Sequence, residues 1–231
     1  MLKYRMNAKT GGRAEVLIYE DIGDSWFGGV SAKQFSIDLK ALGDVQTIDL
    51  RINSYGGDVF DGLAIYRQLV DHKATVISHV DGIAASIASV IAMAGDEIMI
   101  AEAGEIMIHD AWGVAIGPAE DMRAVADRLD AISGTIADVY VARTGQTKDQ
   151  VRAWMTAETT FQSADAVKYG FAQSVAPNLT MAAHKGLSPF HWRRAAGGDP
   201  PTNDAEPPLW TAASEQLRRQ RARLEQARAA R

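Results

Sequence analysis

Residues 82–91 read GIAASIASVI and follow a β-branched run from Ala74 to Val80. A strand, a glycine turn at Gly82 and a helix of small residues would place Ser86 at or near the N-terminus of that helix. Free backbone N–H groups and the helix dipole favour negative charge at such a position. A serine nucleophile needs this environment, although an Ala-Ala-Ser segment is also an ordinary way to begin a helix.

Two strand-turn-helix units follow one another in this region. In the first, residues 45–52 (VQTIDLRI) precede the turn-forming cluster NSYGGD at 53–58, and apolar residues then recur at helical spacing from Val59. The second unit contains Ser86. Two successive βα units predict an α/β fold with a largely parallel sheet. Because ligands collect outside the carboxyl ends of parallel strands, we expect Gly56-Gly57 and Ser86 to line one crevice.

The other expected elements flank these two units. They are a strand at 14–20, a helix opened by a capping box at 31–34, short strands at 97–101 and 105–109 joined by a tight turn, a long helix from Ala119 that stops at Gly145, a helix capped at Thr147, a short helix at 163–169 and a strand at 171–175. The long helix has one apolar stripe and an opposite charged side, so it should pack along that stripe on its own domain or on a partner subunit.

The composition changes after Val175, where six of the seven prolines lie. We expect three parts: a domain at 1–176, a Pro/Gly-rich linker at 177–208 that is disordered, and a basic helix-prone tail at 209–231. Two leucines one heptad apart would allow a short coiled coil or docking helix in the tail, but a solvated basic tail is the simpler interpretation.

Composition also limits the function. With no cysteine, disulfides and thiol nucleophiles are excluded, and covalent catalysis would fall to serine, threonine or lysine. The N-terminal residues lack a signal-peptide core, and no run reaches the ~18 apolar residues that span a bilayer, so we expect a non-exported protein with no membrane partner. The net charge of −5 argues against nucleic acid as a partner of the main body.

Serine catalysis needs a nucleophile, a base, a group that orients the base and oxyanion donors. The best base is His109, because it ends an apolar strand beside a glycine-rich loop rather than lying on a helix face or in the tail. A purely structural role for this histidine is the alternative. The backbone N–H groups of Gly56-Gly57 would serve as oxyanion donors, although the pair is also an ordinary tight turn. It is the conjunction of these features that favours catalysis.

Five segments taken in order resemble the motifs of the Clp protease proteolytic subunit family. They are INSYGG at 52–57 with GLAIY at 62–66, GIAAS at 82–86, MIH at 107–109, and FQSA at 161–164 with AVKYG at 166–170. The resemblance covers roughly residues 14–175, and five motifs in register are far more specific than one. The segments at 21–26 and 57–62 and the proline-rich tail are most similar to the phage and prophage branch, whose members are associated with capsid maturation.

The resemblance implies a Clp/crotonase-like spiral of βα units with a protruding handle helix, and it implies roles for single residues. Ser86 would be the nucleophile, His109 the general base, and the amides of Gly57 and Ile87 the oxyanion hole. In the family an aspartate precedes the Phe-x-Ser-Ala segment by two residues, whereas this chain has Thr159 there.

Glu158, one residue earlier, is our choice for the orienting acid. Alternatively Thr159, which is in register, or a backbone carbonyl orients His109, and the enzyme works as a Ser-His dyad. No metal and no cofactor are expected. The partners implied are a protein or peptide substrate and other copies of the chain in a ring.

The functional hypothesis is a Clp-like serine endopeptidase that cleaves capsid or scaffold protein in phage head maturation, located in the bacterial host cytoplasm or within an assembling procapsid. One alternative is a cellular-type peptidase that depends on a ring ATPase. Another is a catalytically idle assembly scaffold of the same fold. Acyl-CoA hydratases share the spiral fold, but they do not need a serine at position 86.

Overall fold

The computed structural model describes residues 4–23 and 29–176, so the expected linker and tail lie outside the described residues. Eight strands and six helices occur in that part of the chain. In order they are β1 (Tyr4–Ala8), β2 (Arg13–Ile18), α1 (Ala32–Ala41), β3 (Thr47–Ser54), α2 (Val59–Val70), β4 (Thr75–Ala85), α3 (Ile87–Ala92), β5 (Glu97–Ile100), β6 (Glu105–Ile108), α4 (Ala119–Thr144), α5 (Lys148–Thr156), β7 (Thr159–Gln162), α6 (Ser163–Lys168) and β8 (Ser174–Val175).

The strands form one sheet in the order β1-β2-β3-β4-β5-β8, with β6 pairing with β4 and β7. The β1–β2 and β6–β7 pairs are antiparallel, and the other pairs are parallel. Burial alternates along β2 and β3, as expected for strands with one face against the core. The expected α/β fold with a largely parallel sheet is therefore confirmed.

Strand β4 is the longest and pairs with two successive strands on one edge. Its residues 77–80 pair with β5, and its residues 83–85 pair with β6. The two EIMI segments are thus strands, as expected, but they pair with β4 rather than with each other. Strand β6 therefore pairs with the end of β4, beyond the part that pairs with β5.

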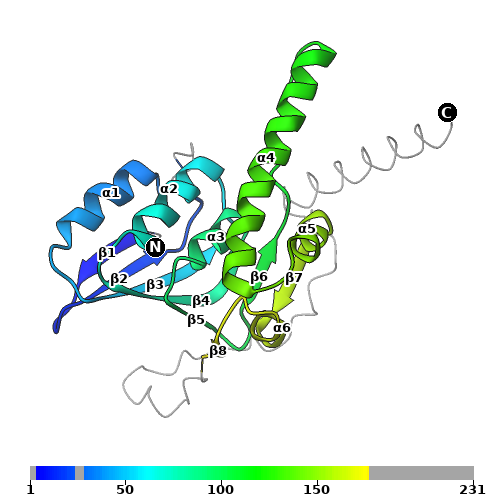
Figure 1. Ribbon diagram of the computed structural model, residues 1–231. Coiled ribbons are helices and arrows are strands. Elements are labelled where there is room, and N and C mark those ends of the chain that lie inside the picture. The colour runs from blue at the N-terminus through cyan, green and yellow to red at the C-terminus, as the bar shows by residue number, and fades with distance from the viewer. Residues whose placement is uncertain (1–3, 24–28, 177–231) are drawn as a thin grey trace, which may run out of the picture. The chain divides into compact units, whose positions relative to one another are not determined.

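Helices α1, α2 and α3 lie together on one side of the sheet (Figure 1). The buried side chains of α1 and α2, including Phe35, Ile65 and Leu69, pack into the same core as the inward residues of the strands. The capping box is confirmed at Ser31, whose hydroxyl accepts a hydrogen bond from the Gln34 N–H. Helices α1 and α2 cover the sheet, and α2 packs against α3, the helix that begins directly after Ser86.

Helix α4 extends away from the rest of the fold (Figure 1). Its first half is largely exposed, whereas Ser133, Ile136, Ala137 and Tyr140 in its second half are buried. It ends at Gly145, which has the left-handed φ of +70° that closes many helices. The expected long helix from Ala119 to Gly145 is confirmed, and its buried stripe contacts its own domain.

Two local features differ from the sequence-based expectations. Gly82 is not a turn, because β4 continues through it to Ala85; a Cβ at Gly82 would lie 2.5 Å from Asn53 Oδ1, so the close neighbour explains the glycine. The chain turns instead at Ser86 itself. Strands β1 and β7 are additional to the expected elements; both are short, and both lie in antiparallel pairs that the local sequence pattern does not specify.

Candidate active site

Ser86 lies on a sharp strand-to-helix turn. It follows β4 directly and precedes α3, with φ of +54° and ψ of −132°. Few non-glycine residues adopt a positive φ, and such strain is typical of functional turns. The backbone holds it in place, since the Ser86 N–H donates to the Met107 carbonyl at 2.9 Å. The side chain is therefore presented outside the end of the sheet.

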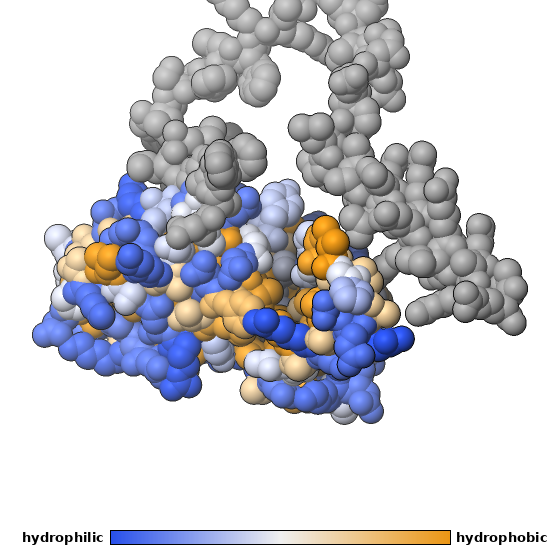
Figure 2. Space-filling view, turned by 90° about the horizontal axis from the view of Figure 1, so that it is seen from above, coloured by the Kyte–Doolittle hydropathy of each residue, from blue (hydrophilic) through white to orange (hydrophobic). Residues whose placement is uncertain are grey.

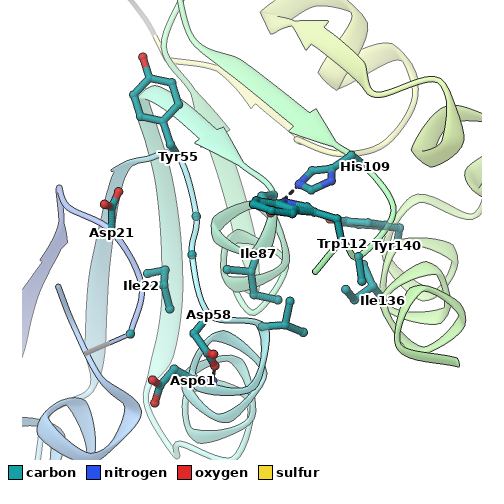
Figure 3. A pocket seen from close by; sticks show the side chains of 16 residues that line it. Asp21, Ile22, Tyr55, Asp58, Asp61, Ile87, His109, Trp112, Ile136 and Tyr140 are labelled. Carbon is teal, nitrogen blue, oxygen red and sulfur yellow. Dashed lines mark hydrogen bonds between the residues drawn. The ribbon is translucent and has the colours of Figure 1, made fainter. Parts of the chain in front are cut away.

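His109 meets Ser86 from the neighbouring strand. It follows β6, and β6 runs parallel to the end of β4 with Ala85 opposite Met107. The His109 Nε2 lies 2.7 Å from the Ser86 Oγ, a hydrogen-bond distance drawn as a dashed line in Figure 3. A nucleophile and a base at this separation can pass a proton directly.

Gly56-Gly57 follows β3, the strand on the other side of β4, so three adjacent parallel strands end at this site. Ile22 bonds to both neighbours of Gly57: its N–H donates to the Gly56 carbonyl at 2.8 Å, and its carbonyl accepts from the Asp58 N–H at 2.9 Å. In a parallel bridge of this kind the N–H of the central residue points to the opposite side. The Gly57 N–H is therefore directed away from Ile22.

Two N–H groups are left without acceptors in this region. Among the backbone hydrogen bonds of residues 4–23 and 29–176, none uses the N–H of Gly57 or of Ile87. Ile87 is the first residue of α3, where a helix cannot supply an acceptor. Both groups border the Ser86 side chain in the lining of one cleft. Their position would allow them to donate hydrogen bonds to an oxyanion if one formed next to Ser86.

Glycines permit the close packing behind this turn. A Cβ at Gly56 would lie 2.7 Å from the Ser86 Cβ, and a Cβ at Gly57 would lie 2.1 Å from the Ile22 carbonyl oxygen. A Cβ at Gly62 would lie 2.1 Å from Ile87 Cγ1, so α2 approaches α3 only because residue 62 has no side chain. These contacts exclude any larger residue without a shift of the backbone.

The candidate orienting groups lie where β7 begins beside β6. Thr159 pairs with Ile108, the residue before His109, and its hydroxyl donates to the Trp154 carbonyl at 2.8 Å. Glu158 immediately precedes the strand and has a left-handed φ of +52°. Both candidates thus lie at the start of β7, next to the end of β6 that His109 follows.

Asp110, the carboxylate next to the histidine in sequence, contacts two side chains of α5. Its Oδ2 accepts a hydrogen bond from the Thr156 hydroxyl at 2.9 Å, and its Oδ1 lies 2.9 Å from Arg152 Nη1. The Arg152 contact is ionic and lacks hydrogen-bond alignment. Both partners lie on α5, so Asp110 ties the start of the loop after His109 to that helix.

The site opens into a cleft of about 750 Å³. Its floor includes Gly57, Ser86 and Ile87, and its rim includes Tyr55 and Trp112, whose side chains are 76% and 70% exposed. Figure 3 shows Tyr55 on the turn after β3 and Trp112 on the segment after His109. The face seen in Figure 2 carries apolar surface toward its middle between hydrophilic flanks. The volume lies in the range typical of ligand-binding clefts.

The described residues contain no group of three or more His, Cys, Asp or Glu side chains placed to hold a metal ion. Within the same residues, none of the helices has the length and apolar character needed to cross a membrane.

Several supporting residues carry no signal in the sequence pattern. Ser54 fixes the Gly56 turn, since its hydroxyl donates to the Glu20 carbonyl at 2.7 Å and accepts from the Gly56 N–H at 3.1 Å. Ser89 and Tyr140 form a buried hydrogen-bonded pair beneath Ser86. Ser54 and Ser89 lie within or close to the glycine and serine motifs, but nothing in the pattern indicates what their hydroxyls contact.

A serine on a strained strand-to-helix turn, a histidine within hydrogen-bond distance and two unused N–H groups beside them define the class of serine hydrolases. The comparison with protein families agrees: residues 12–178 match the Clp protease family, and the chain belongs to it. This is a family of serine peptidases, and the spiral α/β fold expected from the resemblance fits the observed sheet and helices.

Individual relatives give the same result. The chain is 32% identical over 139 residues to ATP-dependent Clp protease proteolytic subunit 2 of Synechococcus sp. (strain CC9605), covering 59% of this chain and 71% of the relative. Identity and coverage are the same for ATP-dependent Clp protease proteolytic subunit 1 of Synechococcus sp. (strain CC9902) and subunit 2 of Parasynechococcus marenigrum (strain WH8102).

Proposed function

We propose that this chain is a serine endopeptidase in which Ser86 is the nucleophile and His109 the general base. The observation that carries the proposal is the 2.7 Å separation of His109 Nε2 and Ser86 Oγ at a strained turn. His109 accepts the Ser86 proton as Oγ attacks the peptide carbonyl carbon, and a C–O bond forms while the carbonyl oxygen becomes an oxyanion.

The Gly57 and Ile87 amides then stabilise the negative charge. Each preorganised donor of this kind contributes roughly 10²–10³ in rate. The protonated His109 returns its proton to the leaving amine, the C–N bond breaks, and an acyl group remains on Ser86. Water activated by the same histidine hydrolyses the ester and regenerates the hydroxyl.

A serine-directed fluorophosphonate tests this assignment. Wild type should be labelled at Ser86, as located by tandem mass spectrometry, whereas Ser86→Ala should not be labelled and His109→Ala should be labelled far more slowly. Ser163→Ala is the matched control, because Ser163 is buried and its hydroxyl donates to the Glu102 carbonyl away from the cleft. Failure of wild type to label would instead support an idle scaffold of the same fold.

The substrate we propose is a capsid or scaffold protein cleaved during phage head maturation, in the host cytoplasm or an assembling procapsid. The support is the similarity of residues 21–26 and 57–62 to the phage and prophage branch, together with the proline-rich segment and basic tail that follow the domain. A basic tail can recruit the enzyme to an acidic assembly partner. Ring assembly, which characterises the family, would enclose the sites in a chamber.

Mass spectrometry of purified wild type and Ser86→Ala examines the maturation role. We expect wild type to trim a capsid or scaffold substrate, or its own tail, and Ser86→Ala to leave both intact. Identical intact masses together with uncleaved capsid substrate would contradict this role.

The names of the similar proteins favour a second candidate, a peptidase that depends on a ring ATPase. All three are described as ATP-dependent proteolytic subunits. This candidate predicts that hydrolysis of a folded protein requires an added ATPase and ATP, whereas short peptides are cleaved without them. Cleavage of a folded capsid substrate by the purified chain alone would favour the maturation role.

A further inference from the structure

Two buried hydroxyl groups, those of Ser89 and Tyr140, connect the candidate nucleophile to α4 by hydrogen bonds. The Ser89 Oγ lies 2.5 Å from the Ser86 carbonyl oxygen and 2.7 Å from the Tyr140 hydroxyl. Ser89 is fully buried, and Tyr140 is 1% exposed. The two residues are 51 positions apart in the sequence, so the contact joins the turn after β4 to the second half of α4.

The direction of the hydrogen bonds follows from counting protons. A serine hydroxyl has one proton, and the Ser86 carbonyl can only accept, so Ser89 donates to it. Tyr140 must then donate to Ser89. Burial raises the pKa of Tyr140 well above its usual value, although the Ser89 contact opposes this, so the phenol keeps its proton at neutral pH.

The Ser86 carbonyl therefore has two donors from the same residue, because the Ser89 N–H also reaches it, at 3.0 Å. This carbonyl belongs to the residue with φ of +54°. A strained turn persists only where its surroundings hold it. The hydrogen bonds of the Ser89 and Tyr140 hydroxyls supply such a restraint. They act directly on the peptide group that contains the Ser86 carbonyl and the Ile87 N–H.

Helix α4 also contacts the segment that follows the base. The Ser133 hydroxyl accepts a hydrogen bond from the Ala111 N–H at 2.9 Å, two residues beyond His109. Ser133 and Tyr140 are seven residues apart, which places them on one face of the helix. One helix face thus contacts the Ser89 hydroxyl on the Ser86 side and the Ala111 backbone on the His109 side.

We propose that Tyr140, acting through Ser89, is a positioning residue that holds the Ser86 turn in its reactive geometry. This inference rests on the proposed peptidase function. Neither side chain is assigned to bond making or breaking; they fix the carbonyl of Ser86, and with it the direction of the Ile87 N–H toward the oxyanion. Removal of the Ser89 or Tyr140 hydroxyl should lower kcat and leave KM nearly unchanged, since substrate contacts in the cleft persist.

Variants Ser89→Ala and Tyr140→Phe test this with a peptide substrate, each rate being divided by the number of sites labelled by the fluorophosphonate. We expect turnover per labelled site to fall by about tenfold in Ser89→Ala and by less in Tyr140→Phe, in line with the loss of a single hydrogen bond. The double variant should resemble Ser89→Ala, because the two hydroxyls act in series. Thermal midpoints measured alongside show whether the fold is retained.

Ser78→Ala is the matched control, because Ser78 is a fully buried serine whose hydroxyl has no hydrogen-bond partner among the described residues. It should keep wild-type turnover. Unchanged turnover per labelled site in Ser89→Ala, or a loss confined to the number of labelled sites, would overturn the proposal while leaving the peptidase function in place. Wild type that neither labels nor cleaves would overturn both, and this outcome is recognised without any variant.

Discussion

Thr159 lies directly opposite Ile108 in the antiparallel pair of β6 and β7. Ile108 is the last residue of β6 and directly precedes the candidate base, so β7 helps to hold the end of β6 from which His109 follows. The Thr159 hydroxyl donates a hydrogen bond to the Trp154 carbonyl, which connects the start of β7 to α5. Glu158 immediately precedes this strand.

Glu158→Gln and Thr159→Val separate the two candidates for orienting His109. If Glu158 orients the base, Glu158→Gln should lower kcat by about tenfold or more, because a neutral amide stabilises imidazolium poorly. Thr159→Val should cost mainly stability, since it removes the bond to Trp154. Peptide hydrolysis and thermal unfolding measure the two effects. Full activity in Glu158→Gln with no activity in Thr159→Val would reverse the assignment.

Glu158→Gly supplies a control for the backbone. Glycine accepts the φ of +52° without strain, so this variant removes the carboxylate while keeping the turn. If the carboxylate is what matters, Glu158→Gly should lose activity as Glu158→Gln does, whereas its unfolding midpoint should stay near that of wild type.

Gly56→Ala should inactivate the protein. The added methyl group would lie 2.7 Å from the Ser86 Cβ and 2.8 Å from the Ala85 carbonyl oxygen, and residue 56 has φ of +98°. Relief requires a shift of either the Gly56 turn or the Ser86 turn, and both border the reacting atoms. We expect loss of fluorophosphonate labelling together with a destabilisation of about 2 kcal/mol or more.

Gly134→Ala is the opposite case. Gly134 lies within α4, and apart from the backbone of that helix no described atom lies within 4 Å of the point that an alanine Cβ would occupy. Replacement of a helical glycine by alanine should stabilise the protein by about 0.5–1 kcal/mol with labelling unchanged. Denaturant unfolding of the two variants compares them directly; equal effects would show that crowding at Ser86 is not the cause.

Much of the fold follows from local sequence patterns. The Ser31 capping box predicts where α1 begins, and the three-four spacing from Ala119 with the glycine at 145 predicts both ends of α4, because caps and apolar stripes are local signals. The β-branched runs likewise predict β3 and β4. Strand β7 escapes such a prediction because its four residues pair only with β6, a strand far earlier in the chain.

The candidate site is predictable in part for the same reason. Parallel strands that end at one edge bring Gly57 and Ser86 together, and the motif order adds His109. The Ser89–Tyr140 contact depends on how α4 packs, and the hydroxyl pattern contains no sign of it. The sequence pattern places the turn at Gly82, since glycine is the usual turn residue, whereas the structure uses the rarer conformation at Ser86.

Asp58 links the stability of α2 to the candidate oxyanion turn. Its carboxylate accepts hydrogen bonds from the N–H groups of Phe60 and Asp61, both at 2.9 Å, and its own N–H donates to Ile22 beside Gly57. Asp58→Ala should destabilise the protein by about 1 kcal/mol, whereas Asp58→Asn keeps a capping oxygen and should cost much less. Urea unfolding at pH 7 measures both. An equal loss of stability in Asp58→Ala and Asp58→Asn would show that helix capping is not what Asp58 contributes.

The charged face of β2, β3 and β4 should make stability depend on acid pH. A hydrogen bond from Lys9, with Arg5 beside it, lowers the pKa of Glu15. Burial alone would raise the pKa of Asp49, but Arg13 and His79 more than reverse this and lower it. A carboxyl whose pKa is lower in the folded protein stabilises it above the unfolded pKa of about 4, and this contribution disappears as pH falls through the folded value.

Asp49→Asn should therefore be less stable than wild type at pH 7, by about 1 kcal/mol or less because Arg13 is largely exposed. The difference should shrink as pH falls from about 5 to below 3, where the wild-type carboxylate becomes protonated. Urea unfolding of both proteins across this range measures it. A difference that stays constant with pH would mean that the amide alters packing rather than charge, and would contradict the assignment of acid sensitivity to the Arg13–Asp49 pair.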